Sequence, residues 1–364
     1  MSALKLNCPA DQTQEIQAVS RWPTSALCNW MQNGSAELLW HGPYALPITT
    51  SVQPRQPYAC YITSLRSAWF DYAAEEIANK PLAAWGFRCA GKVAMLLGMD
   101  KIVLVGNAPV STNIWPHQYI PEISILCQKA ATTYKDCFIG VRNLQTDKHA
   151  PLMSELKEQG FYAIPARIVY EFDFRQKLVK ERSHLNRDRS SLKRSNLKVN
   201  LLSTISDKQA RRFRDLYQSI YIDKHSVLNA QYTSQFFADM VYSGVMKPLV
   251  LQDEEKRIVA FAMLYSVDDT LTVPALGYDL QSPINGLYRL LFAAISLYAQ
   301  DKCMLLNYSS GAGDFKRKRG GVAHLEYTFL KAPQKLHSFK SSILSIAERY
   351  GQGIRECDMI AWGA

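Results

Sequence analysis

The stretch Ile102-Val-Leu-Val-Gly106 opens the part of the chain that decides the fold. Its apolar run predicts a buried strand, and after it come a loop with proline, a helix, an apolar strand at residues 137–141, a helix ending at Gly160 and another strand. The stretch Thr272-Val-Pro-Ala-Leu-Gly277 starts the same series about 170 residues later. Two matching series in the same order predict a duplicated domain.

Strands alternate with helices on both sides of these two stretches. The apolar patterns predict strands at residues 58–63, 101–106, 137–141, 161–174, 248–252, 258–265, 270–276, 304–308 and 325–330. They predict helices at residues 69–77, 120–134 and 151–159, one that begins after Ser206 in a capping box with Gln209, and one that Ser282-Pro283 opens. The alternation predicts the α/β class, with two tandem domains that each hold a mixed, twisted sheet flanked by helices.

Prolines interrupt the pattern in two places. Pro43, Pro47, Pro54 and Pro57 predict that the first 57 residues are an irregular lead-in with one short helix. Pro274 lies inside a predicted strand, which places that strand at a sheet edge or next to a bulge.

Length and composition limit the class of protein. A chain of 364 residues that is 48% apolar is long enough for two domains with cores of their own. We expect residues 1–174 to form the first domain and residues 175–364 the second. The stretch from Met1 to Gln14 lacks the apolar run of a secretory signal, and no segment is apolar for long enough to span a membrane. The eight cysteines stand singly, which suits a reducing compartment. We therefore expect a cytoplasmic protein without a metal site.

The net charge of +10 is concentrated in two places. From Arg175 to Lys198, nine basic residues stand against two acids, and Lys316, Arg317, Lys318 and Arg319 form a second run. Concentrated positive charge attracts polyanions such as tRNA, although a solvated basic face carries the same pattern. The first of these segments, from Arg175 to Lys198, is the candidate surface for tRNA or another polyanion.

Several motifs resemble one enzyme superfamily. The segment Leu152-Met-Ser-Glu-Leu-Lys-Glu-Gln-Gly-Phe161 resembles the last helix and following strand of GNAT acyltransferases. Residues 277–328 resemble the FemAB-like branch of that superfamily through Gly286-Leu-Tyr-Arg-Leu-Leu291, Ser309-Ser-Gly-Ala-Gly313, Phe315-Lys316, Arg319-Gly-Gly321 and Glu326-Tyr-Thr328. The resemblance covers residues 58–332 and implies two GNAT-like domains in one chain.

The resemblance implies amide formation by direct attack of an amine on an acyl donor, in an N-acyltransferase without a covalent enzyme intermediate. Acyl-CoA is the expected donor. The first alternative is a Fem-type transferase that uses aminoacyl-tRNA, and the second is a non-catalytic double-GNAT scaffold that binds nucleic acid. Salt dependence separates these readings, because release of counterions from about six phosphates gives a steep log–log slope and a CoA site does not.

Donor-binding residues are expected at two sites of the second half. CoA-dependent GNAT enzymes hold the pyrophosphate on a glycine-rich turn, and the corresponding Gln281-Ser-Pro-Ile-Asn-Gly286 keeps one glycine at the helix start. Backbone N–H groups near the helix start are expected to meet phosphate there. The basic run beside Gly320-Gly321 is either a second phosphate contact or a plain basic loop. The expected donor-binding residues are Asn285, Gly286, Leu287, Lys316, Arg317, Arg319 and Gly320.

Three residues are candidates for the chemistry. Glu326 shares a strand face with His324 and is a candidate for accepting the ammonium proton. Asp279 is either a base or an aspartate that caps a loop, and Tyr308, like Tyr327, either protonates the leaving group or packs in the core.

The first half lacks a comparable set of donor-binding residues. Trp115 and His117 stand where backbone amides would be needed to hold phosphate. We therefore interpret the first half as a degenerate copy that shapes the acceptor cleft.

Overall fold

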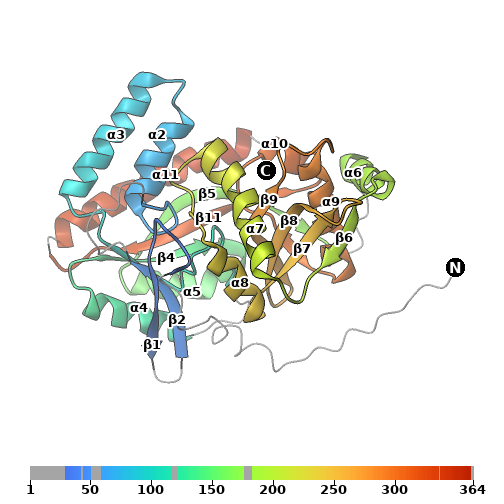
Figure 1. Ribbon diagram of the computed structural model, residues 1–364. Helices are drawn as coiled ribbons and strands as arrows, with labels where there is room; N and C mark the ends of the chain where they lie inside the picture. The colour runs from blue at the N-terminus through green and yellow to red at the C-terminus, as the bar shows by residue number, and fades with distance from the viewer. Residues whose placement is uncertain are drawn as a thin grey trace.

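Eleven strands form one mixed sheet in the computed structural model, which describes residues 29–41, 44–50, 59–115, 121–175, 183–335 and 337–361. Their order across the sheet is β1-β2-β3-β4-β11-β5-β10-β9-β8-β7-β6, with helices packed on the sheet (Figure 1). The α/β class is confirmed. The prediction of a separate sheet in each half is wrong, because strands of both halves pair within this one sheet.

The strands alternate with helices along most of the chain. The strands are β1 (Ala36–His41), β2 (Tyr44–Thr50), β3 (Ile102–Val105), β4 (Phe138–Leu144), β5 (Tyr162–Asp173), β6 (Lys198–Leu201), β7 (Met246–Gln252), β8 (Ile258–Val267), β9 (Thr270–Tyr278), β10 (Leu305–Asn307) and β11 (Val322–Lys331). The helices are α2 (Tyr72–Glu76), α3 (Pro81–Leu96), α4 (Pro121–Thr133), α5 (Thr146–Glu158), α6 (Ser183–Arg194), α7 (Asp207–Ile220), α8 (Ser234–Tyr242), α9 (Leu287–Asp301), α10 (Gly313–Arg317) and α11 (His337–Ala361). Two π-helical turns, Ser67–Asp71 and Tyr221–His225, adjoin α2 and α7.

The series predicted from the two apolar stretches occurs twice in the structure. In the first half, β3 and β4 are parallel and α4 connects them, and α5 then leads to β5. In the second half, β9 and β10 are parallel and α9 connects them, and α10 leads to β11. Each parallel pairing covers three residue pairs.

The last strand of each series pairs with the other half. β11 of the second half lies between β4 and β5 of the first, antiparallel to both. β5 in turn pairs with β10 of the second half. The two halves are therefore interlocked at the centre of the sheet, and the division at residues 174 and 175 stays a prediction.

Alternating side chains of β8 show how the helices cover the two faces of the second half. Phe261 and Met263 pack in the cluster that includes Phe213 of α7 and Phe236 of α8. Ala260, Ala262 and Leu264 pack on the opposite face in the cluster that includes residues of α6 and α9. Both faces of the central strands are buried, which explains their nearly continuous apolar sequence.

Three local predictions were wrong. Residues 36–50 include a β-hairpin rather than an irregular lead-in, and residues 59–63 form turns rather than a strand. Pro47 lies outside the part of β2, residues 48–50, that pairs with β3, so its missing N–H withholds no bond from that ladder. The helix after Ser282-Pro283 begins only at Leu287.

Two other local predictions were confirmed in whole or in part. The capping box of Ser206 and Gln209 at the start of α7 is present. Pro274 lies next to a register shift between β8 and β9, as one alternative predicted, but β9 is an interior strand. The ladder between β9 and β10 stops at Thr272, so Pro274 withholds no N–H from that ladder.

In the part of the chain that the structure describes, no helix has both the length and the apolar character to cross a membrane. The predictions for the stretch from Met1 to Gln14, for His117 and for residues 176–182 lie outside the described residues.

Candidate active site between the two halves

The parallel strands β9 and β10 separate after a short pairing. The last pair is Asn307 with Thr272, where β10 ends while β9 continues to Tyr278. Beyond this pair, no strand in the described part of the chain pairs with β9 on that side. We call the space between the two strands beyond this pair the opening.

A loop of the first half bridges the two separating strands. The loop follows β3, and its Ser111 Oγ donates to the carbonyl oxygen of Pro274 on β9 (3.3 Å). The next residue, Thr112, donates from Oγ1 to Ser309 Oγ just after β10 (2.9 Å). The loop is held from a third side by Tyr232, whose Oη donates to the carbonyl of Pro109 (2.8 Å). The opening is therefore occupied along part of its edge by protein.

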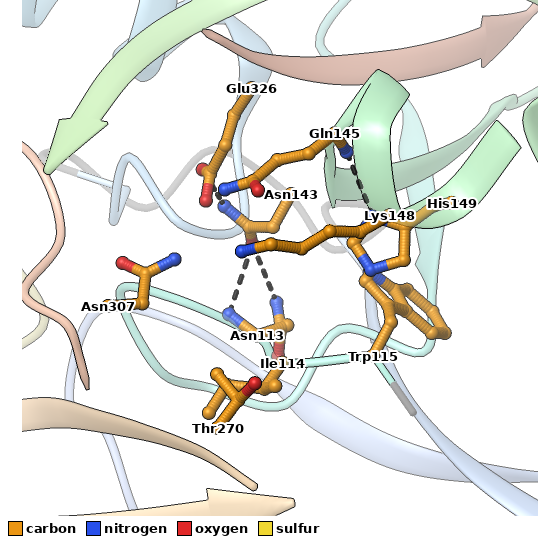
Figure 2. A pocket seen from close by; sticks show the side chains of 10 residues that line it. All are labelled: Asn113, Ile114, Trp115, Asn143, Gln145, Lys148, His149, Thr270, Asn307 and Glu326. Atoms are coloured by element: carbon orange, nitrogen blue, oxygen red, sulfur yellow. Dashed lines mark hydrogen bonds between the residues drawn. The ribbon is translucent and has the colours of Figure 1, made fainter. Parts of the chain in front are cut away.

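A polar pocket lies beside this bridge, where the ends of β3 and β4 meet the second half (Figure 2). Seven of its ten lining residues come from the first half and three, Thr270, Asn307 and Glu326, from the second. The first half thus supplies most of the pocket, although sequence reasoning assigned it no chemical residue. The lining contains four side-chain amides, those of Asn113, Asn143, Gln145 and Asn307.

Glu326 of β11 enters this pocket as a buried, paired carboxylate. Its side chain is 1% exposed, and Oε2 accepts from Arg167 Nε (2.8 Å) and Asn143 Nδ2 (2.7 Å). Asn143 has φ of 64°, a left-handed conformation that Asn adopts more readily than most residues, and this aims its amide at Glu326 and Asn113. A buried carboxylate needs such partners to stay charged.

Arg167 connects Glu326 with the mouth of the separated strands. Its Nη2 donates to Thr112 Oγ1 (2.8 Å) and its Nη1 to Ser309 Oγ (3.3 Å). The same guanidinium therefore touches the carboxylate, the bridging loop and the turn after β10.

A second buried carboxylate, Glu171 of β5, was missed from the sequence. Its side chain is 3% exposed, and Lys148 Nζ lies 2.5 Å from each of its oxygens. Gln145 Nε2 and Asn307 Nδ2 also donate to Oε1, at 3.0 and 3.2 Å. His324 extends this cluster, with Nε2 3.8 Å from Glu171 and Nδ1 3.5 Å from Asp147. An acid inside an apolar strand was the available signal, since acids are rarely buried without a partner.

Lys316, one of the expected donor-binding residues, is buried in the protein. The side chain is 2% exposed, and Nζ donates to the carbonyl oxygens of Tyr308 (2.7 Å), Ser309 (3.0 Å) and Ser310 (2.7 Å). Burial, with a smaller contribution from Arg167, lowers the pKa of Lys316 to about 7. The amine fixes the turn that carries Ser309.

We expect the stability of the chain to rise with pH relative to the Lys316→Met variant. The pKa of Lys316 falls from 10.5 to about 7 on folding, so in that window the unfolded chain binds a proton that the folded chain lacks. Between pH 7 and pH 9, the unfolding free energy of the parent chain should therefore rise by roughly 2 kcal/mol more than that of the Lys316→Met variant. Urea titrations across this range measure the difference, and parallel curves for the two proteins would show that Lys316 stays protonated.

Two other basic residues of the run, Arg317 and Arg319, also have protein partners. Arg319 is 6% exposed, pairs with Asp188 of α6 (2.5 Å) and stacks on the Phe315 ring at 3.5 Å. Arg317 donates to Tyr170 Oη (2.8 Å) and pairs with Asp314. Gly320 has φ of 97° and lets the chain turn toward β11. The run therefore ties α10 to its neighbours.

The predicted helix-start residues line a second pocket. Gly286 is the N-cap of α9 with φ of 76°, Leu287 is buried, and Asn285 faces a hollow that Arg194 of α6 and Arg289 of α9 also line. A side chain at position 286 would meet the Arg289 guanidinium at 2.8 Å. A helix start with two arginines beside it suits a phosphate group.

Asp279 and Tyr308 lie apart from the polar pocket. Asp279 pairs with Arg212 (2.7 Å) and accepts from the Gln281 backbone N–H (2.9 Å). Burial favours a higher pKa for this carboxyl, but these partners outweigh burial and lower the pKa. Burial raises the pKa of Tyr308 well above its usual value, and its ring packs on Phe292. Of the three chemical candidates, Glu326 alone lines the pocket.

Where the structure describes the chain, no three or more His, Cys, Asp or Glu side chains gather in a way that would hold a metal ion.

Solved structures show where this fold occurs. The chain superposes with a TM-score of 0.51 on the C-terminal DUF2156 domain of a putative lysylphosphatidylglycerol synthetase from Agrobacterium fabrum, at 13% identity over 90% of this chain and 96% of that one. FemX matches with a TM-score of 0.50, at 9% identity over 88% of this chain and 93% of FemX. No family model and no curated protein matches the sequence. The expected resemblance is confirmed at the level of the fold: this chain shares its fold with FemX and with the synthetase domain.

Proposed function

We propose that the chain is an aminoacyltransferase that moves an aminoacyl group from tRNA to an amine. The sequence resembles Fem-type transferases, which use such donors, and the fold is shared with FemX and a synthetase domain along most of the chain. These likenesses favour the aminoacyl-tRNA alternative over acyl-CoA, which was the first expectation. The acceptor amine enters from the side of the polar pocket.

The bridge across β9 and β10 is the observation that carries this choice of donor. A pantetheine arm binds by pairing with the backbone of the separated strands. Here Pro274 has no N–H to offer, and its carbonyl oxygen already accepts from Ser111. A CoA thioester would have to displace the loop, whereas an aminoacyl-tRNA bound at the start of α9 does not need to pair with the backbone of these strands.

Basic side chains near the start of α9 provide contacts for a nucleic-acid backbone. Arg194 and Arg289 line the hollow beside Asn285, and Arg187, Lys193 and Lys198 are exposed on α6 and β6. Arg189, in the same segment, instead bonds Ser296 inside the protein. Five accessible cations along α6, β6 and the start of α9 suit the phosphates of an acceptor stem.

Glu326 is the residue that we propose for the proton transfer. The amine attacks the carbonyl carbon of the aminoacyl ester, and the bond from that carbon to the ribose oxygen breaks. The ammonium formed in this step loses its proton to Glu326, directly or through water. Glu326 then passes this proton, directly or through water, to the ribose oxygen that leaves, so the carboxylate is restored. Arg167 lies beside Glu326 and Ser309, where its positive charge would stabilise the oxyanion of the intermediate.

Transfer assays with aminoacyl-tRNA and with acyl-CoA test the proposal. We expect transfer to an amine from a charged tRNA and a log–log slope of affinity on salt of roughly −4 for five or six phosphates. The Arg194→Ala and Arg289→Ala variants should each weaken tRNA binding by roughly 10- to 150-fold, the cost of a charge-assisted contact. Arg211→Ala, which removes an exposed arginine of α7, is the matched control.

Two outcomes would contradict this proposal. Transfer from acyl-CoA with no response to any charged tRNA would restore the CoA-dependent reading. Salt-sensitive tRNA binding without transfer from any of the charged tRNAs would leave the nucleic-acid-binding scaffold.

A further inference from the structure

Helix α3 exposes apolar side chains to solvent to an unusual degree. Leu82 is 86% exposed, Trp85 65%, Val93 54% and Leu96 82%. In Figure 1, α2 and α3 stand together at the upper left and project beyond the rest of the molecule. Surface helices ordinarily turn such residues toward the core, so an exposed row of this length indicates a surface that another body covers.

The exposed residues form one stripe along the helix. Leu82, Trp85, Val93 and Leu96, with the half-buried Cys89 between them, follow one another at intervals of three or four residues, which places them on one side of an α-helix. The opposite side is the one that packs on the protein. There Ala84 and Gly91 are buried, and a side chain at position 91 would meet Phe70 at 2.9 Å. Because this side of α3 packs on the protein, the stripe on the other side faces solvent.

The charges of α3 show what kind of body fits the stripe. Its charged residues, Arg88 and Lys92, are both basic and both exposed. Lys92 borders the stripe, one position before Val93. A second copy packed antiparallel on the stripe would bring these cations against their own equivalents, which is unfavourable. Glu75 and Glu76 are exposed on α2, before the turn that leads into α3, and do not belong to the helix that carries the stripe.

We propose that α3 docks on the surface of an anionic lipid bilayer. The helix lies in the plane of the interface, with Leu82, Trp85 and Leu96 inserted at the boundary between headgroups and acyl chains. Tryptophan suits this depth because its ring is apolar and its N–H bonds with headgroups. Arg88 and Lys92 then contact lipid phosphates, so the interaction holds the protein on the membrane without crossing it.

Co-sedimentation of the full chain with lipid vesicles tests this proposal. We expect binding to vesicles of equal parts phosphatidylcholine and phosphatidylglycerol, and weak binding to phosphatidylcholine alone. Replacing Arg88 and Lys92 together by Gln should weaken binding to the anionic vesicles by roughly 30-fold. Replacing Leu82 and Trp85 together by Gln should weaken it by at least roughly tenfold.

Matched controls keep these outcomes specific. Tyr242→Gln and Leu201→Gln remove exposed apolar side chains outside α3, and Lys224→Gln with Arg211→Gln removes two exposed cations; neither pair should change the binding. Circular dichroism and melting checks that all variants fold. Equal binding to both kinds of vesicle, or no binding to either, would overturn the proposal. So would a dimer in analytical ultracentrifugation that the Leu82 and Trp85 changes convert to monomer without any vesicle binding.

Discussion

Replacing Glu326 by Gln should lower the rate of aminoacyl transfer by roughly 10²- to 10⁴-fold, the usual contribution of a positioned proton acceptor. Glutamine keeps the size of the side chain, and its amide oxygen can accept from Asn143 and Arg167 as the carboxylate does. What the change removes is the ability to take up the ammonium proton. The loss should therefore appear in kcat, measured under single-turnover conditions, with little change in KM.

A structural role for Glu326 would give a different result. If the carboxylate only holds Arg167 in place through its charge, the variant should lose melting temperature and substrate affinity together and keep its rate at saturation. Asp239→Asn is the matched control, because Asp239 also accepts bonds from side chains, those of Trp30 and Gln235, outside the pocket. Full activity in Glu326→Gln would show that another group accepts the proton. Glu171, the second buried carboxylate, is then the next candidate.

The duplication could be predicted from the sequence because local patterns specify it. Apolar runs of strand length, the glycine at position 160 and the capping box of Ser206 each depend on a few neighbouring residues. The exchange of β5 and β11 between the halves does not follow from such local patterns. Which strand lies beside β5 depends on pairing between residues more than a hundred positions apart, and nothing in the alternation along β11 distinguishes β4 and β5 from other neighbours.

The candidate site was predictable only in part for a related reason. Glu326 stood out as an acid in a half-apolar strand, and Glu171 has the same signal in β5, but its partner Lys148 lies in another element. The family motif drew attention to the second half, whereas most of the pocket is built by the first. A run of four basic residues looks the same whether it faces water or a buried acid, so Asp188 could not be assigned to Arg319 from sequence spacing.

The pair of Arg319 and Asp188 leads to the second large effect. Their side chains are 6% and 5% exposed, and Nε and Oδ2 are 2.5 Å apart. Arg319→Ala leaves a buried carboxylate without its partner, which costs about 3–5 kcal/mol, and not the few tenths that an exposed residue would cost. We expect the melting temperature to fall by at least roughly 6 °C, in a thermal scan without any substrate.

The double change separates the loss of the pair from the loss of a donor contact. Asp188→Asn alone should also destabilise the chain, because the guanidinium then lacks its carboxylate. The double variant, Asp188→Asn with Arg319→Ala, should lose less stability than the two single variants lose together. If Arg319 held donor phosphate instead, Arg319→Ala would melt as the parent chain does and lose tRNA affinity. The guanidinium contacts Asp188, the ring of Phe315 and the carbonyl oxygen of Phe315, so it joins α10 with α6. Because Asp188 also lines the hollow beside Arg194, that junction sets the position of α6 over the start of α9, where the proposed donor binds.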